Sequence, residues 1–412
     1  MVTRRVFLKS TGMSLVTLGF APSFLTRTAE AAGTRGKLLI AIFQRGAVDG
    51  LNMIVPHGDA EYYRVRPTIA IARPAAGAGA AVDLDGYFGF HPRMSPLTPL
   101  WHNHSLAIVH AAGSPDSTRS HFDAQDYMET ATPGVKSTKD GWLNRYLQVA
   151  HEHGTPLTAI ALARQMPRSL QGPAPALAIA SVAEFGVRGV IGTRETFEEA
   201  YRRAADQVLK GTANDAFNAM RTLSAGPGAA RAYRPANGAT YPRSPFGQAL
   251  QEISRLAKAD VGLEVAFADS TQWDHHVNEG GATGQMANRL GDFANGIAAL
   301  TQDLGDRMAE TVILTMSEFG RTVAENGSRG TDHGHGNAML VIGGGVKGGI
   351  YGEWPGLGEN QRHEGRDLAI TTDFRDVFGE VVMRHLGADE SAAAKVFPGY
   401  GVRPARFRKL FG

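Results

Sequence analysis

Residues 311–351, TVILTMSEFGRTVAENGSRGTDHGHGNAMLVIGGGVKGGIY, carry the pattern that decides the fold class. The apolar runs 312–316 and 338–342 are short and rich in β-branched or aliphatic residues, which is typical of buried strands. Polar residues 317–322 follow the first run, and residues 331–336 precede the second. Open α/β sheets place their sites beyond the carboxyl ends of strands. The stretch therefore predicts a metal-dependent hydrolase site at the edge of an α/β sheet.

The rest of the chain alternates apolar runs of strand length with longer helical patterns. Such alternation favours a mostly parallel central sheet covered by helices on both faces. We expect a single domain over residues 32–412, with a helical and loop insertion around 190–245. The expected strands also include 37–43, 106–111, 157–162, 176–180 and 261–268. The expected helices are 91–101, 121–130, 142–151, 246–258, 286–304 and 373–385.

The N-terminus has the pattern of an export signal. Residues 3–9, TRRVFLK, contain a twin-arginine pair, a short apolar stretch follows at 13–25, and Ala29-Glu30-Ala31 offers a cleavage site. We predict that residues 1–31 are a twin-arginine signal peptide, that the twin-arginine translocase is a partner during export, and that the protein is periplasmic or extracellular. An uncleaved N-terminal anchor is the alternative. No later stretch reaches 18 apolar residues, so we expect no membrane span after cleavage.

Composition narrows the classes of function. The 412 residues include no cysteine, which excludes disulfides, thiolate zinc sites and cysteine nucleophiles. The signal segment holds four basic residues and one acidic residue, so its removal takes the formal charge from +2 to about −1. No clustered basic face is evident, and we therefore expect no nucleic-acid partner.

The first pair of candidate metal ligands is Asp274 and His276. They follow the expected strand 261–268 and stand two residues apart on an extended segment, so that both side chains face the same side. They are candidates for binding one Zn²⁺, Mn²⁺ or Mg²⁺ ion. The alternative is a carboxylate–histidine hydrogen bond that stabilises a loop. His275 points the other way.

The second group of candidate ligands comes from the opening stretch. Asp332, His333 and His335 are interleaved with glycines, and Asp332 is placed to orient one of the imidazoles. The alternative is a solvated glycine–histidine loop. Glu318, at the end of a buried strand, is either a further ligand or the partner of Arg321 in an ion pair.

A third polar cluster joins the expected strand 106–111 to the helix 121–130. A helix N-terminus stabilises negative charge, so a hydroxyl there is a candidate nucleophile. Ser120 followed by Asp123 also fits a capping box. Arg119 and Arg45 are candidates for clamping an oxyanion, and His121 is either catalytic or structural. The hydroxyl candidates are Ser117, Thr118 and Ser120.

These motifs together resemble the twin-arginine-exported bacterial proteins classed as domain of unknown function 1501, within the alkaline phosphatase and sulfatase superfamily. The resemblance implies an alkaline phosphatase-like fold, with Asp274 and His276 in the positions of an Asp and a His that bind one metal and His333 or His335 in the position of a later ligand. The matching motifs are RG at 45–46, DGLN at 49–52, SHFDAQ at 120–125, WDHH at 273–276, SEFGRT at 317–322, TDHG at 331–334 and GGGVKGG at 343–349.

The resemblance implies an exported metal-dependent hydrolase of phosphate or sulfate esters, acting on a small-molecule ester or a glycan. It also leaves an alternative, because Ser317-Glu318 occupies the place where the superfamily usually has Asp-His. On that alternative the protein is a non-catalytic binding or assembly protein on the same fold.

Overall fold

The computed structural model describes residues 36–151, 154–181 and 233–412. The expected signal peptide and residues 190–232 of the expected insertion lie outside the described residues. One large sheet runs through the molecule, and a smaller three-stranded sheet, β2-β4-β3, lies beside it. The strands of the large sheet are β1 (Leu38–Gln44), β5 (Leu106–Gly113), β6 (Ala159–Leu162), β7 (Leu177–Ile179), β8 (Val265–Ser270), β9 (Thr311–Met316), β10 (Asn337–Gly343), β11 (Gly349–Tyr351) and β12 (Thr372–Asp373).

The direction of one strand brings the polar loops together. The large sheet has the order β11-β5-β10-β9-β1-β8-β6-β7, with β12 also paired to β5. Strand β10 is antiparallel to both of its neighbours, whereas the other pairs in this sheet are parallel. The start of β10 therefore lies at the edge where β9, β1, β8 and β5 end. Residues that precede β10 consequently meet residues that follow the other strands.

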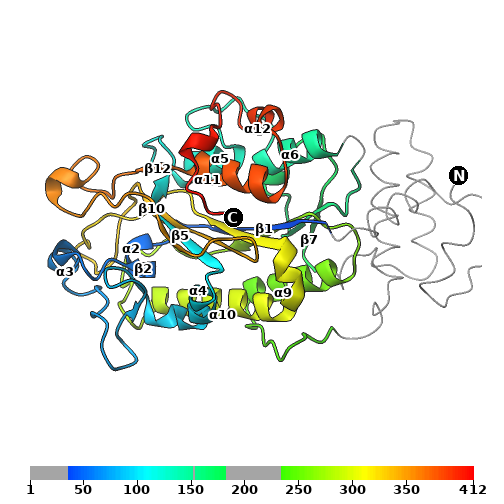
Figure 1. Cartoon of the computed structure of the whole chain (residues 1–412). Helices are drawn as coiled ribbons and strands as arrows, with labels where there is room; N and C mark the ends of the chain where they lie inside the picture. The colour runs from blue at the N-terminus through cyan, green and yellow to red at the C-terminus, as the bar shows by residue number, and fades with distance from the viewer. Residues whose placement is uncertain (1–35, 152–153, 182–232) are drawn as a thin grey trace, which may run out of the picture.

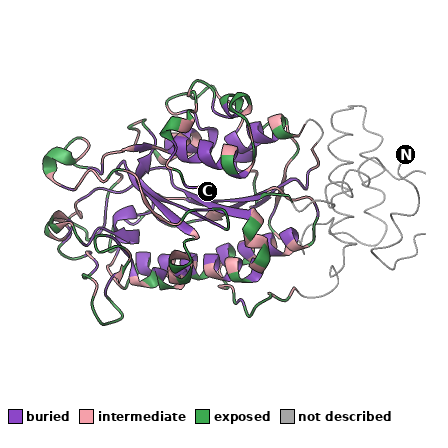
Figure 2. Cartoon of the chain, in the orientation of Figure 1, coloured by how far each residue is buried: buried purple, intermediate pink, exposed green. Residues whose placement is uncertain are grey.

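Helices cover both faces of this sheet, as Figure 1 shows. Alternate residues of β1 belong to two separate cores: Leu38, Ile40 and Ile42 pack on one side, and Leu39, Ala41 and Phe43 on the other. Both faces of β1 are buried, which explains its uninterrupted apolar sequence (Figure 2). One layer contains α4 (Thr98–His102), α9 (Pro245–Lys258) and α10 (Gln285–Leu304), and the other contains α5 (His121–Thr130), α6 (Trp142–Ala150), α11 (Phe374–Glu380) and α12 (Glu390–Val396).

This arrangement confirms the predicted fold class, a mostly parallel sheet covered by helices on both faces. The helix expected at 91–101 is instead split into η1 (Pro92–Leu97) and α4. Pro96 and Pro99 cannot donate a backbone hydrogen bond, so a continuous α-helix is broken there. The last helix continues from α11 as a π-turn, η5 (Val381–His385).

Several short elements had no clear sequence signal. They lie between β1 and β5 in the chain and include the three strands of the small sheet. These are α2 (Gly50–Met53), β2 (Ile54–Val55), α3 (Ala60–Val65), β3 (Val82–Asp83) and β4 (Gly89–Phe90). Among the described residues, no helix is both long and apolar enough to cross a membrane.

Candidate metal centre

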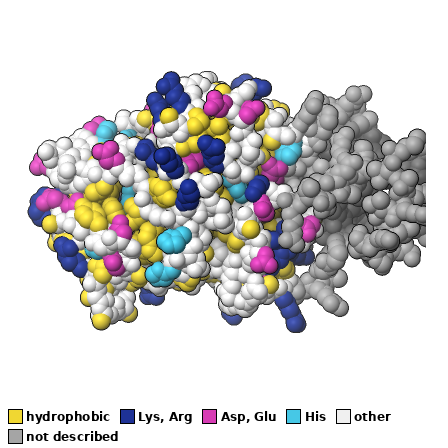
Figure 3. Space-filling model, viewed as in Figure 1, with side chains coloured by type: hydrophobic (Ala, Val, Ile, Leu, Met, Phe, Trp, Pro, Cys, Tyr) yellow, Lys and Arg dark blue, Asp and Glu magenta, His cyan; other side chains and the backbone are white. Residues whose placement is uncertain are grey.

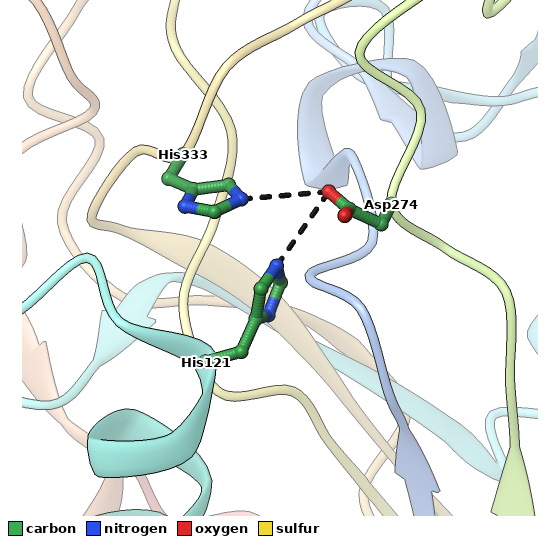
Figure 4. A group of neighbouring side chains, drawn as sticks. All are labelled: His121, Asp274 and His333. Carbon is green, nitrogen blue, oxygen red and sulfur yellow. Dashed lines mark ion pairs between the residues drawn. The ribbon is translucent and has the colours of Figure 1, made fainter.

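Four side chains from two loops and one helix converge at the carboxyl edge of the sheet. Asp274 and His276 follow β8, His333 precedes β10, and His121 is the first residue of α5. The Nε2 atoms of the three imidazoles surround one oxygen, Oδ1 of Asp274. Their distances from it are 2.9 Å for His276, 3.4 Å for His333 and 3.5 Å for His121. In Figure 4 the ring of His121, at the start of α5, and the ring of His333, in the loop before β10, both point at Asp274.

Each imidazole is held in place by a contact to Nδ1, the ring nitrogen that faces away from Asp274. Nδ1 of His121 lies 2.8 Å from Glu318 Oε1, and Nδ1 of His276 lies 2.8 Å from Asp332 Oδ1. Nδ1 of His333 lies 2.8 Å from the carbonyl oxygen of Arg119. Because all three partners are acceptors, the network assigns the proton of each neutral ring to Nδ1 and leaves a lone pair on Nε2. The three lone pairs then face a common centre.

Glu318 is the buried anchor of this arrangement. Its Oε1 accepts hydrogen bonds from His121 Nδ1, from Gln125 Nε2 at 2.9 Å and from the Gly46 amide at 2.8 Å. Burial works to raise the pKa of this carboxyl group, but these hydrogen bonds lower it below its usual range. Glu318 is therefore ionised, and its hydrogen bond in turn raises the pKa of His121.

Asp274 is the ionised centre of the cluster. Burial works to raise its pKa, but the hydrogen bond and charge of Arg321, with the nearby imidazoles, lower it to about 2. Burial also lowers the pKa of His333, which keeps that ring neutral near pH 7. A carboxylate beside imidazole nitrogens is the donor set of many metal sites.

Arg321 fixes the position of Asp274 and joins the loops. Its guanidinium, which is fully buried, donates to Asp274 Oδ1 at 2.6 Å. It also donates to four backbone carbonyl oxygens, so that one side chain connects the loops that follow β1 and β8 with the loop that precedes β10. These carbonyls belong to Gly46, Ala47, Trp273 and Thr331.

Glycines let these loops approach one another backbone to backbone. A Cβ on Gly320 would lie 1.8 Å from the Gly336 carbonyl oxygen, and one on Gly334 would lie 2.3 Å from the Arg321 carbonyl carbon. A Cβ on Gly330 would lie 2.4 Å from the carbonyl carbon of His276. A side chain at any of these positions would force the facing backbone segments apart. The glycines around the histidines therefore serve close packing of the loops.

The donor set fits a divalent cation. The buried Nε2 of His121 has no hydrogen-bond partner among the described residues. The Nε2 atoms of His276 and His333 are 2.9 Å apart, and two lone pairs at that distance repel unless a proton or a cation lies between them. Ligands of a tetrahedral zinc ion stand about 3.3 Å from one another. The three distances from Asp274 Oδ1 to the imidazole nitrogens and the distance between His276 and His333, 2.9–3.5 Å, bracket that spacing.

The other predicted ligands lie elsewhere. Glu318 and Asp332 contact the far sides of imidazoles, and neither carboxylate joins the group around Asp274. His335 is not brought to the cluster, because its ring stacks on that of His363 at 4.1 Å. The alternative Glu318–Arg321 ion pair is not formed, since Arg321 pairs with Asp274.

The other residues predicted to be catalytic, Ser120, Arg45 and Arg119, each bind neighbouring groups of the chain. Ser120 is the N-cap of α5 and accepts from the Asp123 amide, as the capping alternative predicts. Arg45 is bound to Glu129 and Asp269. Arg119 is bound to two carboxylates and supplies the carbonyl that holds His333.

Sequence reasoning gave His121 no role as a ligand and missed the clamp formed by Arg321. The position of His121 at a helix start after a strand was the signal for its place at the sheet edge. Nothing in the sequence around Arg321 indicates its bonds to carbonyls some 275 residues away.

Comparisons with known proteins agree with the expected family. The family model described as "Protein of unknown function (DUF1501)" matches residues 36–393. A search of curated proteins finds no match.

Three solved structures are similar at low identity. The C-terminal periplasmic domain of EcEptC from Escherichia coli, in complex with Zn, is 10% identical over 76% of this chain and 74% of that chain, with a TM-score of 0.36. The PsFucS1 sulfatase from Pseudoalteromonas sp. is 10% identical over 89% and 72%, with a TM-score of 0.33. The lipoteichoic acid synthase LtaP from Listeria monocytogenes is 9% identical over 92% and 79%, with a TM-score of 0.35. These likenesses are distant and assign no activity.

Proposed function

The chain belongs to the DUF1501 family of proteins of unknown function, and we propose that it is a metal-dependent hydrolase of phosphate or sulfate esters. One observation carries the proposal: three imidazoles, each held through Nδ1, direct Nε2 at the same oxygen of Asp274. A single hydrogen bond between one imidazole and Asp274 would be enough to stabilise a loop. Three imidazoles oriented around one carboxylate oxygen instead match the ligands of a metal site.

His121, His333 and Asp274 would hold the ion, with His276 beside them, so that one position stays open for water. A divalent cation bound there would supply Lewis-acid polarisation of an ester oxygen and a lowered pKa for a bound water. Imidazole nitrogens beside one carboxylate oxygen favour zinc over magnesium, which prefers oxygen ligands. Manganese remains within the proposed set.

The chain's own residues prepare the site for this chemistry. Arg321 keeps Asp274 ionised, and Glu318 keeps the proton of His121 on Nδ1. The acceptors behind the rings fix their orientation before any ligand arrives, so little reorganisation is needed. This support comes from buried groups, since the side chains of Glu318 and Arg321 have no exposed area.

We propose that water, and not Ser120, is the attacking group. Ser120 is exposed, and its Oγ caps α5. The guanidinium groups of Arg45 and Arg119 are bound by carboxylates, so they hold the surrounding loops and do not form a free oxyanion clamp. The substrate class, a small phosphate or sulfate ester that includes sugar esters, follows from the family resemblance. Export through a twin-arginine signal to the periplasm or beyond is part of the same proposal.

The test is elemental analysis of the natively expressed protein, followed by turnover of p-nitrophenyl phosphate and p-nitrophenyl sulfate. We expect about one zinc or manganese ion per chain, and we expect that a chelator removes both metal and turnover. His121→Ala should lose the metal. His102→Ala is the matched control, because His102 is exposed at the end of α4. Wild-type protein that contains no metal and turns over neither ester would refute the proposal.

The second candidate is a non-catalytic binding or assembly protein. It is favoured by the bonds of Asp274 Oδ1, which already accepts from Arg321 at 2.6 Å and has His276 Nε2 at 2.9 Å. A proton on His276 would satisfy this oxygen without any metal. That function predicts a metal-free protein in which His121→Ala has no effect on partner binding.

A further inference from the structure

A second polar cluster lies beside the candidate metal centre. It consists of Arg119, His335, His363, Glu364 and Asp367. Arg119 Nη2 donates to Glu364 at 2.6 Å and to Asp367 at 2.7 Å. The rings of His335 and His363 stack with centroids 4.1 Å apart and 23° between their planes. We call this group the loop subsite.

The loop subsite is attached to the metal centre through the backbone. The carbonyl of Arg119 holds His333 Nδ1 at 2.8 Å, and the guanidinium of Arg366 donates to the carbonyl of His333. His335 is two residues beyond His333 on the same loop. The loop subsite therefore adjoins the metal centre.

Two nitrogen atoms of the loop subsite have no hydrogen-bond partner among the described residues. Nε of Arg119 and Nε2 of His363 are buried without a hydrogen bond among the described residues. His363 Nε2 is 3.8 Å from Glu364 Oε1, which is beyond hydrogen-bond distance. The residue His335, whose ring stacks on that of His363, is only 8% exposed. Buried polar atoms are nearly always paired, so these indicate a ligand or ordered water.

The charges of the loop subsite indicate the kind of ligand. Arg119 and Arg366 are balanced by Glu364 and Asp367. A balanced cluster offers little attraction to a second anionic group. It offers both donors and acceptors, because Glu364 remains half-exposed beside the unpartnered nitrogens. Hydroxyl groups, which both donate and accept, fit such a surface.

We propose that the loop subsite binds the hydroxyl groups of a carbohydrate, so that the substrate is a sugar ester whose phosphate or sulfate group lies at the metal centre. The position of the ester rests on the proposed function, whereas the sugar contact depends only on residues of this chain. Arg119 and His363 would donate to sugar oxygens, and Glu364 would accept from sugar hydroxyls. Aryl and alkyl esters lack these partners.

The experiment compares glucose 6-phosphate with phenyl phosphate by calorimetric titration of the full chain, both metal-free and zinc-loaded. The two probes share the phosphate group and differ in hydroxyl groups. We expect glucose 6-phosphate to bind at least tenfold more tightly in both forms. The variant His363→Phe keeps the stacked ring and removes Nε2, and it should reduce this preference about tenfold, the effect of one hydrogen bond. Glu364→Gln provides a second variant on an exposed position, and Glu390→Gln on α12 is the control.

The outcomes separate the two proposals. A preference for glucose 6-phosphate that is present without zinc and lost in His363→Phe or Glu364→Gln supports the loop subsite, even if the protein proves to have no esterase activity. Equal binding of the two probes overturns it. A preference that survives both variants also overturns it, because the sugar would then be bound elsewhere.

Discussion

Replacing Glu318 by Gln tests whether a buried charge behind His121 supports metal binding. Glu318 Oε1 accepts three N–H groups, and its Oε2 lies 3.2 Å from Ser317 Oγ. A glutamine has the same shape. Its carbonyl oxygen can take the place of Oε1, and its amide group can donate to the serine hydroxyl, so we expect the fold to persist.

The change removes the charge that makes the His121 hydrogen bond strong. Charge-assisted hydrogen bonds are roughly twice as strong as neutral ones. Replacing a group that orients a metal-bound histidine typically costs about 10- to 100-fold in metal affinity. That range corresponds to about 1.4–2.8 kcal/mol. Glu318 has no exposed side-chain area, so water cannot reach His121 Nδ1 and compensate for the lost carboxylate charge. We therefore expect a loss of zinc affinity in the upper half of this range.

The assay is zinc affinity, measured by competition with a chromophoric chelator at fixed pH, with circular dichroism to verify the fold. Asp332→Asn is the matched control, because Asp332 holds His276 in the same way but its side chain is 52% exposed. Solvent screening should limit its effect to a few-fold. A folded Glu318→Gln protein with wild-type affinity would refute the reasoning, and so would a larger effect in Asp332→Asn.

Three further predictions concern neighbouring residues. Asp274→Asn should abolish retention of zinc through gel filtration, since it removes the only carboxylate among the proposed ligands; retention of one equivalent would contradict the site. Arg321→Met should lower the free energy of unfolding in urea by about 3 kcal/mol, because it leaves several buried carbonyl groups unpaired. Burial and the adjacent Asp49 carboxylate raise the pKa of Glu279 well above its usual range, so the folded chain binds a proton that the unfolded chain releases. Stability should therefore fall as pH rises from the ordinary carboxyl range toward that raised pKa, and Glu279→Gln should weaken this fall in urea titrations at pH 5 and pH 8.

The sequence predicted the layers of the fold because local pattern determines them. The run at 37–43 is apolar at every position, since both faces of β1 are buried, and the structure places the strand at Leu38–Gln44. The helix expected at 121–130 has the same bounds in α5 because its capping signal is local. The helix expected at 91–101 was only partly right, because prolines interrupted it.

The candidate site was predicted in part. The motifs around Asp274, His276 and His333 marked strand ends, and strand ends meet at one edge of a sheet. The motif around His335 gave the same signal, yet that ring stacks on His363. Neighbouring residues on a loop point in different directions, and spacing alone does not say which one faces the centre.

What the sequence alone determined is therefore the set of elements and the kind of side chains at their ends, because both follow from periodicity and residue type. The tertiary structure decided the rest. The antiparallel direction of β10 brought residues 331–336 to the edge where β8 and β9 end. Contacts across about 200 residues, from Glu318 to His121 and from Arg119 to His333, fixed which nitrogen of each ring faces Asp274. The chemistry of an imidazole depends on its hydrogen-bond partner, and that partner is known only once the chain has folded.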